Sequence, residues 1–106
     1  MKNGDITVVD LEKRINEGNV CVLDVRTPEE RMFGYIEGSD NIDFYDKNFR
    51  SEIEKLDRSK NYIVYCASGG RSSKTVRMME EIGFTNCYNL NGGFGEWEKL
   101  GMRVIK

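Results

Sequence analysis

The stretch Tyr62-Ile63-Val64-Tyr65-Cys66-Ala67-Ser68-Gly69-Gly70-Arg71-Ser72 decides the fold. Its first four residues are aromatic and β-branched, a composition typical of a buried strand. A helix over 71–82 is predicted next, because three apolar residues recur at helical spacing: Val76, Met79 and Ile82. A strand that passes through a short loop into a helix is the repeating unit of parallel sheets. The sequence therefore predicts an α/β fold with Cys66 at the point where a strand leads into a helix.

Toward the N-terminus, short apolar runs alternate with amphipathic stretches. The predicted elements are a strand over 6–9, a helix from Asp10 to Glu17 that ends at Gly18, a strand over 20–23, a helix beginning at Thr27, a short strand within 40–43 and a helix over 48–56. Asp10 is the expected N-cap of the first helix. At the second helix, Thr27 fits the N-cap, Pro28 fits the first helical position and Glu30 completes a capping box.

Beyond the central stretch the alternation continues. Gly83 and Phe84 fit a Schellman-like ending of the helix over 71–82. A core strand is predicted over 86–90, and a last helix follows Gly92-Gly93, containing Phe94, Trp97 and Leu100 and ending at Gly101. Alternating strands and helices indicate a mostly parallel sheet with helices on both of its faces.

The composition is that of one soluble globular domain, residues 1–106. A chain of 106 residues has room for one hydrophobic core, and 39% of its residues are apolar and 32% charged. The net charge of −2 argues against nucleic-acid binding, which needs a clustered basic surface. No basic-then-apolar leader opens the chain, and no apolar run approaches the roughly 20 residues of a bilayer span. We therefore expect a cytoplasmic monomer that does not associate with membranes.

Three cysteines and the lack of histidine limit the possible chemistry. An odd number of cysteines without Cys-x-x-Cys spacing predicts thiols in a reducing compartment. Without histidine, a zinc site lacks its usual ligands, and no Ser-His or Cys-His pair can form. We therefore expect no metal, no cofactor and no imidazole base. Cys21 and Cys87 lie within predicted strands among apolar neighbours and are expected in the core.

The loop after the central strand is the candidate site. Cys66 is the candidate nucleophile, and the residues predicted to cradle its substrate through backbone amides are Ala67, Ser68, Gly69, Gly70, Arg71 and Ser72. The glycine pair lets successive N–H groups turn inward as an anion-binding nest, and the following helix N-terminus adds donors and partial positive charge. In such surroundings the pKa of a thiol falls below its free value of about 8.5. The alternative is a cysteine that merely ends a strand as a small hydrophobe.

Three further features have two interpretations each at the level of sequence. The Arg71 side chain either faces the bound anion or turns to a carboxylate. Asp24 and Arg26, at the carboxyl end of a neighbouring strand, are candidates for a pocket rim, while a structural pair of Arg26 with Glu30 is the alternative. Gly92-Gly93 is interpreted as close packing of a helix against a strand end in preference to a second nest.

Three motifs, in this order, resemble the rhodanese-like family over nearly the whole chain. Asp24 through Glu30 matches its Asp-Val-Arg-x-x-x-Glu motif, and Cys66 through Ser72 matches its catalytic Cys-x-x-Gly-x-Arg-Ser loop. The family's C-terminal pattern is matched by Gly83-Phe84, Leu90-Asn91-Gly92-Gly93 and Trp97. The resemblance implies one rhodanese domain, a three-layer α/β sandwich with a five-stranded parallel sheet.

The same resemblance implies a sulfurtransferase. Cys66 would take a sulfane sulfur from thiosulfate or from a protein or low-molecular-weight persulfide, become a persulfide itself, and pass the sulfur to a thiol, cyanide-like or protein acceptor. A thiolate that attacks a sulfur–sulfur bond needs no general base once its pKa is low, which agrees with the lack of histidine. The loop amides would stabilise charge on the outer sulfur as an oxyanion hole stabilises oxygen.

Two positions depart from the family pattern. Tyr35 stands where the motif Gly-His-Ile-x-Gly-Ala has its histidine, and we interpret this position as structural. Ala67 stands where members that use thiosulfate often carry a basic residue directly after the cysteine. Without that charge the hold on a dianionic donor weakens, so thiosulfate is expected to be a poor substrate.

Two other functions are compatible with a cysteine in such a loop. Cysteine phosphatases and arsenate reductases resemble one another in a Cys-x5-Arg spacing, but four residues separate Cys66 from Arg71 here, a smaller cradle better suited to sulfur. The aspartate general acid of a phosphatase is not assignable to Asp24 or Asp43 from sequence. A non-catalytic binding module is the second alternative, although inactive family members generally lose the cysteine that this chain retains.

Overall fold

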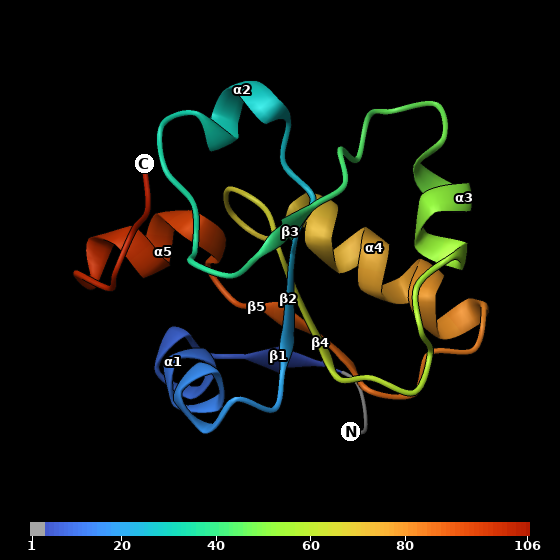
Figure 1. The fold of residues 1–106 in the computed structure, drawn as a ribbon, viewed down its shortest axis with the longest axis horizontal. Coiled ribbons are helices and arrows are strands. Elements are labelled where there is room, and N and C mark those ends of the chain that lie inside the picture. Colours follow the sequence, from blue (N-terminus) through green and yellow to red (C-terminus); the bar gives the residue numbers. More distant parts are fainter. Residues whose placement is uncertain (1–3) are drawn as a thin grey trace.

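In a computed structural model, which describes residues 4–106, a parallel five-stranded sheet lies between two layers of helices (Figure 1). The strands are β1 (Asp5–Ile6), β2 (Cys21–Asp24), β3 (Asp40–Asn41), β4 (Tyr62–Tyr65) and β5 (Cys87–Leu90). Their order across the sheet is β1-β5-β4-β2-β3, and every neighbouring pair is parallel. The α/β fold class predicted from the sequence is confirmed.

Within residues 4–106 there are five helices, of which the first four connect successive strands and the last follows β5; together they cover both faces of the sheet. They are α1 (Val8–Glu17), α2 (Pro28–Arg31), α3 (Phe49–Glu54), α4 (Gly70–Glu81) and α5 (Gly93–Lys99). Helices α1 and α5 lie on one face, and α3 and α4 lie on the other (Figure 1). Strand β4 is buried on both faces, since Ile63 and Tyr65 pack toward α1 and α5 while Tyr62 and Val64 pack toward α3 and α4. This double burial explains why its sequence is continuously apolar.

The N-terminal boundary differs from the prediction. The strand expected over 6–9 ends at Ile6, and Val8 already belongs to α1. Thr7 is the N-cap, because its side chain accepts the N–H of Asp10 at 3.1 Å, and Asp10 therefore sits in the first turn instead of capping it. Val8 is buried beside Leu11, so packing of this face overrides the β propensity of the two valines.

Two helix ends follow the predicted chemistry. At α2, the Thr27 side chain accepts the N–H of Glu30, and the Glu30 carboxylate accepts the N–H of Thr27, so the capping box is confirmed. At the end of α4, the N–H of Phe84 donates to the carbonyl of Met79 at 2.9 Å and that of Gly83 to Glu80 at 3.2 Å. This pair of bonds is the Schellman ending predicted at Gly83 and Phe84.

The register of the central strands sets the position of the candidate site. Asp24 at the end of β2 pairs with Tyr65 at the end of β4, so the segments that follow both strands emerge side by side. Helix α2 and the loop between β4 and α4 consequently lie at one end of the sheet (Figure 1). Within residues 4–106, no helix is both long and apolar enough to cross a membrane.

Candidate active site

The sulfur of Cys66 lies directly after β4, buried beneath the turn into α4. Only 2% of the residue is exposed. Its Sγ accepts the backbone N–H of Gly69 at 3.1 Å and that of Ser72 at 3.4 Å. Gly69 adopts a φ of +118° at the N-cap of α4, a conformation that strains any residue with a side chain. The glycine therefore folds the loop back so that helix N-terminal donors point at the sulfur.

Hydrogen bonding decides the acidity of this thiol. Burial by itself raises the pKa of Cys66. The Ser72 hydroxyl and the backbone N–H groups of Ser72, Gly69 and Ser68 act against burial and bring the pKa below its ordinary value. Cys66 is consequently more often a thiolate at neutral pH than an ordinary cysteine, as the sequence predicted for this loop.

The Arg71 side chain turns to a carboxylate. Its two terminal nitrogens donate to the two oxygens of Glu30 at 2.7 and 2.9 Å, which is a bidentate ion pair. The hydrogen bond from Arg71 lowers the pKa of Glu30 to about 2. Of the two sequence-level interpretations of Arg71, the carboxylate partner is the one found, and the suggested pair of Arg26 with Glu30 is wrong.

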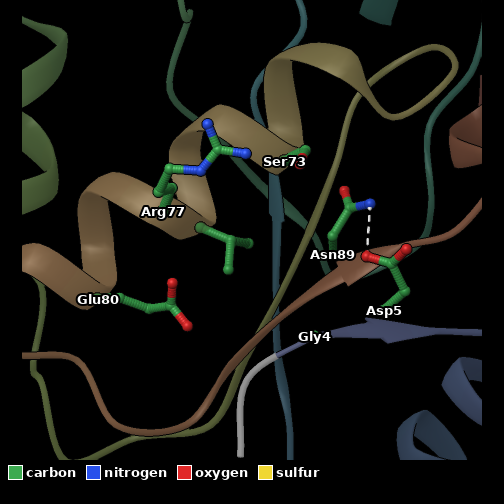
Figure 2. A pocket seen from close by; sticks show the side chains of 7 residues that line it. Gly4, Asp5, Ser73, Arg77, Glu80 and Asn89 are labelled. Carbon is green, nitrogen blue, oxygen red and sulfur yellow. Dashed lines mark hydrogen bonds between the residues drawn. The ribbon is translucent and has the colours of Figure 1, made fainter. Parts of the chain in front are cut away.

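Asn89 joins the site from β5, a contact that the sequence analysis missed. The Ser72 hydroxyl lies 3.3 Å from the Cys66 sulfur and donates a short hydrogen bond to the side-chain oxygen of Asn89. The amide nitrogen of Asn89 donates in turn to Asp5 on β1 at 3.1 Å (Figure 2). The only sequence signal was a polar residue in an otherwise apolar core strand, which by itself indicates no particular partner.

The second glycine pair supports the loop from behind. The N–H of Phe94 donates to the carbonyl of Cys66 at 2.8 Å, and that of Gly95 donates to Ala67 at 3.0 Å. A Cβ on Gly93 would lie 2.6 Å from the Cys66 carbonyl oxygen, closer than real Cβ contacts allow. The predicted close packing of the last helix against a strand end is thus confirmed, with the candidate loop as its contact.

Asp24 and Arg26 belong to a buried network beneath the loop. The Asp24 carboxylate, which is fully buried, accepts hydrogen bonds from Arg26, Arg31 and the Tyr65 hydroxyl. The Arg26 guanidinium also lies 4.3 Å from the centre of the Phe94 ring. Both side chains are therefore engaged in the core, and a contribution of either one to a pocket rim stays a prediction.

Only some of the residues predicted to cradle the substrate act on the Cys66 sulfur through hydrogen bonds. Gly69 and Ser72 donate directly, Ser68 contributes to the lowered pKa, and Arg71 acts on Glu30. Binding of a substrate by Ala67 or Gly70 stays a prediction. In the part of the chain that the structure describes, no three His, Cys, Asp or Glu side chains cluster in a way that could hold a metal ion.

Comparison with known proteins decides the family. The chain matches the rhodanese-like domain over residues 7–100. The protein belongs to the rhodanese-like family. It is 34% identical over 90 residues to thiosulfate sulfurtransferase 16, chloroplastic, from Arabidopsis thaliana, an alignment that covers 76% of this chain and 75% of the relative.

Other matches agree with a rhodanese-like domain of this size. A crystal structure of a rhodanese-related protein from Thermoplasma volcanium superimposes with a TM-score of 0.86 at 35% identity, covering 95% of this chain and 96% of the other. Some relatives are much longer. The chain is 34% identical over 93 residues to a tRNA uridine(34) hydroxylase from Pelagibacter ubique, and the match covers 87% of this chain but 31% of that protein.

The family's histidine position, here Tyr35, has a structural setting in this rhodanese-like domain. The backbone of Tyr35 exchanges two hydrogen bonds with Ile105 near the C-terminus, at 2.8 and 2.9 Å. The Tyr35 ring lies beneath the guanidinium of Arg31, whose centre is 4.0 Å from the ring centre. The segment therefore holds the chain end against α2, in agreement with the interpretation from sequence.

Proposed function

We propose that this rhodanese-like protein is a sulfurtransferase that carries a sulfane sulfur on Cys66. The main support is the buried Cys66 sulfur with two backbone N–H donors aimed at it, from Gly69 and Ser72. Donors fixed in this way stabilise negative charge on sulfur without any reorganisation during the reaction. Relatives named thiosulfate sulfurtransferases support the same class of reaction.

In the first half-reaction the Cys66 thiolate attacks the outer sulfur of a donor R–S–SH. A new S–S bond forms at Cys66, the S–S bond of the donor breaks, and R–S⁻ leaves with the electron pair of that bond. The product is a Cys66 persulfide. No base is required, because the hydrogen bonds from Ser72 and Gly69 already lower the pKa of the thiol.

In the second half-reaction a nucleophilic acceptor attacks the outer sulfur of the persulfide. The S–S bond at Cys66 breaks, the acceptor keeps the outer sulfur with its proton, and the Cys66 thiolate is the leaving group. The donors that lower the pKa of Cys66 also stabilise it as a leaving group, since a thiol of lower pKa leaves faster. One set of hydrogen bonds therefore serves both half-reactions.

A persulfide is the donor that we propose in preference to thiosulfate. Ala67 brings no charge to the loop, and the Arg71 guanidinium is already paired with both oxygens of Glu30. A dianionic donor would have to compete with Glu30 for that guanidinium. A persulfide carries less charge and has less need of it. The reducing cytoplasm, where thiols persist, is the proposed site of the reaction.

Cysteine phosphatase chemistry fits the loop less well. A transferring phosphoryl group needs cationic groups around its oxygens. The arginine that closes this loop is engaged with Glu30 and follows Cys66 after four intervening residues. We therefore expect no turnover of p-nitrophenyl phosphate. Turnover lost in Cys66→Ser would instead assign the protein to the phosphatases.

The experiment that tests the proposal is mass spectrometry after exposure to sulfur donors. The purified protein is incubated separately with thiosulfate, glutathione persulfide and a cysteine desulfurase that bears a persulfide. Gain of one sulfur atom on the peptide containing Cys66 is expected, with the persulfide donors faster than thiosulfate, and no gain in Cys66→Ser. Absence of the added sulfur with every donor would favour a non-catalytic binding module.

A further inference from the structure

The orientation of the Asn89 side chain is forced by chemistry. An ionised carboxylate only accepts hydrogen bonds, so the amide nitrogen of Asn89 must be the atom that faces Asp5 at 3.1 Å (Figure 2). The amide oxygen then faces the Ser72 hydroxyl. Because an amide oxygen only accepts, Ser72 must be the donor in that hydrogen bond.

This orientation fixes where the single proton of the Ser72 hydroxyl points. The proton is directed at Asn89, so a lone pair of the same oxygen faces the Cys66 sulfur at 3.3 Å. A protonated Cys66 donates its S–H to that lone pair, so Cys66, Ser72 and Asn89 each donate a hydrogen bond to the next group, ending at Asp5. A Cys66 thiolate has no proton to donate and instead requires a donor. The hydroxyl cannot give one proton to both neighbours.

We propose that Asn89 is a positioning residue that competes with the Cys66 thiolate for the hydroxyl proton of Ser72, and that Asp5 holds Asn89 in the competing orientation. The inference deepens the proposed function, because it concerns the thiol that would carry the sulfur. Without the competition, the hydroxyl would add to the backbone donors from Gly69 and Ser72 at all times. With it, the hydroxyl turns to the sulfur only when the sulfur is charged enough to outcompete an amide oxygen.

The effect of this competition on Cys66 can be separated from the effect of the charged groups around the thiol. Arg71 on α4 approaches from the loop side, but Glu30 of α2 neutralises it. Asp24, at the end of β2, is shared by the guanidinium groups of Arg26 and Arg31, and none of the three is altered in the test. Asp5 on β1 is joined to the site through the amide of Asn89. A variant that changes the amide without changing a charge therefore reports on the hydroxyl proton.

The test is the pH dependence of Cys66 alkylation. The rate of reaction with iodoacetamide is followed by mass spectrometry of the peptide that contains Cys66, and the midpoint of its rise with pH gives the pKa of the thiol. Asn89→Leu frees the hydroxyl to donate to the thiolate, so the midpoint should fall by roughly half to one pH unit, the equivalent of one hydrogen bond. Ser72→Ala removes the hydroxyl altogether and supplies the background in which no hydroxyl proton can reach the thiolate.

The double variant isolates the proposed route. If Asn89 acts through the hydroxyl, Asn89→Leu should have no effect on the midpoint in the Ser72→Ala background. An equal fall of the midpoint in both backgrounds would overturn the proposal, as would an unchanged or raised midpoint in Asn89→Leu alone. These outcomes measure alkylation, so they stand or fall independently of whether any donor loads sulfur onto Cys66.

A second variant avoids any change in the core. Asp5→Asn replaces the acceptor-only carboxylate by an amide, which lets Asn89 turn over and point its nitrogen at Ser72. The hydroxyl proton then becomes available to the sulfur, and the midpoint should fall. Glu80→Gln is the matched control, because it removes the same charge from the same pocket, on α4, without contacting Asn89 (Figure 2). Equal shifts in the two variants would reduce the effect to charge and overturn the role of Asp5.

Discussion

Cys66, directly after β4, and Cys87, at the start of the neighbouring strand β5, lie in one hydrophobic cluster, yet the pKa values of their thiols are shifted in opposite directions. Burial raises the pKa of Cys87 to about 11. Burial also acts to raise the pKa of Cys66, but hydrogen bonds from Ser72, Gly69 and Ser68 reverse the shift. Burial therefore acts in the same direction on both thiols: it dominates at Cys87, and the hydrogen bonds outweigh it at Cys66.

The direction of the strands explains where those donors come from. Cys66 follows the carboxyl end of β4, where the chain enters a helix and N–H groups lack partners within the helix. Cys87 begins β5, and its sulfur points to the carbonyl of Val76 within α4 at 3.9 Å. A carbonyl oxygen can accept a hydrogen bond from a thiol but cannot donate one to a thiolate. In a parallel sheet, the carboxyl edge is thus the edge at which a cysteine becomes reactive.

The largest expected contrast is in alkylation of the two thiols by iodoacetamide. A thiol with a pKa of about 11 is ionised at pH 7 in about one molecule in ten thousand. The pKa of Cys66 lies below that of an ordinary thiol, so Cys66 should react at least roughly a hundredfold faster than Cys87. Peptide mass spectrometry at neutral pH measures both rates in one sample. Comparable rates in the folded protein would show that the loop donors do not act on the sulfur.

Gly93→Ala should make Cys66 less reactive, and so more like Cys87, by displacing the loop that carries it. The new methyl group would lie within 2.8 Å of the carbonyl groups of Cys66 and Ala67, which must then move. We expect sulfur loading of Cys66 to slow at least about tenfold, because small displacements of reacting groups are costly. The rate of loading is measured by mass spectrometry.

Gly18→Ala is the matched control for that substitution. Gly18 also has a positive φ, +79°, but nothing lies within 4 Å of its would-be Cβ. The Gly18→Ala variant should lose stability through backbone strain alone, and the rate of sulfur loading on Cys66 should be unchanged. Equal loss of loading in both variants would mean that stability, and not the position of the loop, limits the reaction.

Arg71→Ala tests whether the ion pair at the loop supports Cys66. Arg71 lies at the start of α4, and removal of its guanidinium leaves the Glu30 carboxylate of α2 without its bidentate partner. We expect a loss in sulfur-transfer rate of roughly fivefold, the equivalent of about 1 kcal/mol. Arg77→Ala removes an exposed arginine from the same helix and should leave the rate unchanged. Unchanged kinetics in Arg71→Ala would place that arginine outside the mechanism.

The smallest expected effect is on stability in acid. The pKa of Glu30 is lowered from its ordinary value of 4.5 to about 2 in the folded protein. Its contribution to the free energy of unfolding is therefore present above about pH 4.5 and is lost as the pH falls toward 2. For a partly exposed pair we expect about 1 kcal/mol.

Urea unfolding between about pH 5 and pH 2.5 measures this loss. Glu30→Gln keeps the capping box, since glutamine also fits its third position, but should lack the pH-dependent part of the stability. Glu29→Gln, on the same helix, is the control and should behave as the unaltered protein does. An identical acid dependence in Glu30→Gln would contradict the role of the pair.

Sequence predicted the elements that are buried on both faces and the parts of the site that are contiguous. Strand β4 was predicted with its observed bounds and α4 within one residue, because four apolar residues and a helical stripe leave little choice. Cys66 and its glycines follow one another in the chain, so their geometry is encoded locally. The predicted start of the first helix at Asp10 was wrong, because two valines favour a strand until packing is considered.

The remaining features depend on contacts between distant segments, which one sequence does not specify. Asn89 reaches Ser72 across 17 residues and Asp5 across 84. Glu30 and Arg71 are 41 residues apart, so nothing local shows which way the arginine turns. These contacts follow from the strand order, in which β5 lies between β1 and β4, and β2 lies beside β4. That order is a property of the whole fold.

The hydrogen bonds from Gly69 and Ser72 to the Cys66 sulfur also couple the stability of the loop to the charge on the sulfur. A loop that favours a charged sulfur must itself be favoured by one, because the coupling is reciprocal. The lowered pKa of Cys66 therefore adds stability as the pH rises from that pKa toward the ordinary thiol value, and withdraws it as the pH falls. Any anionic cargo on Cys66 should act in the same way, so the resistance of the loop to proteolysis would report whether the protein is loaded.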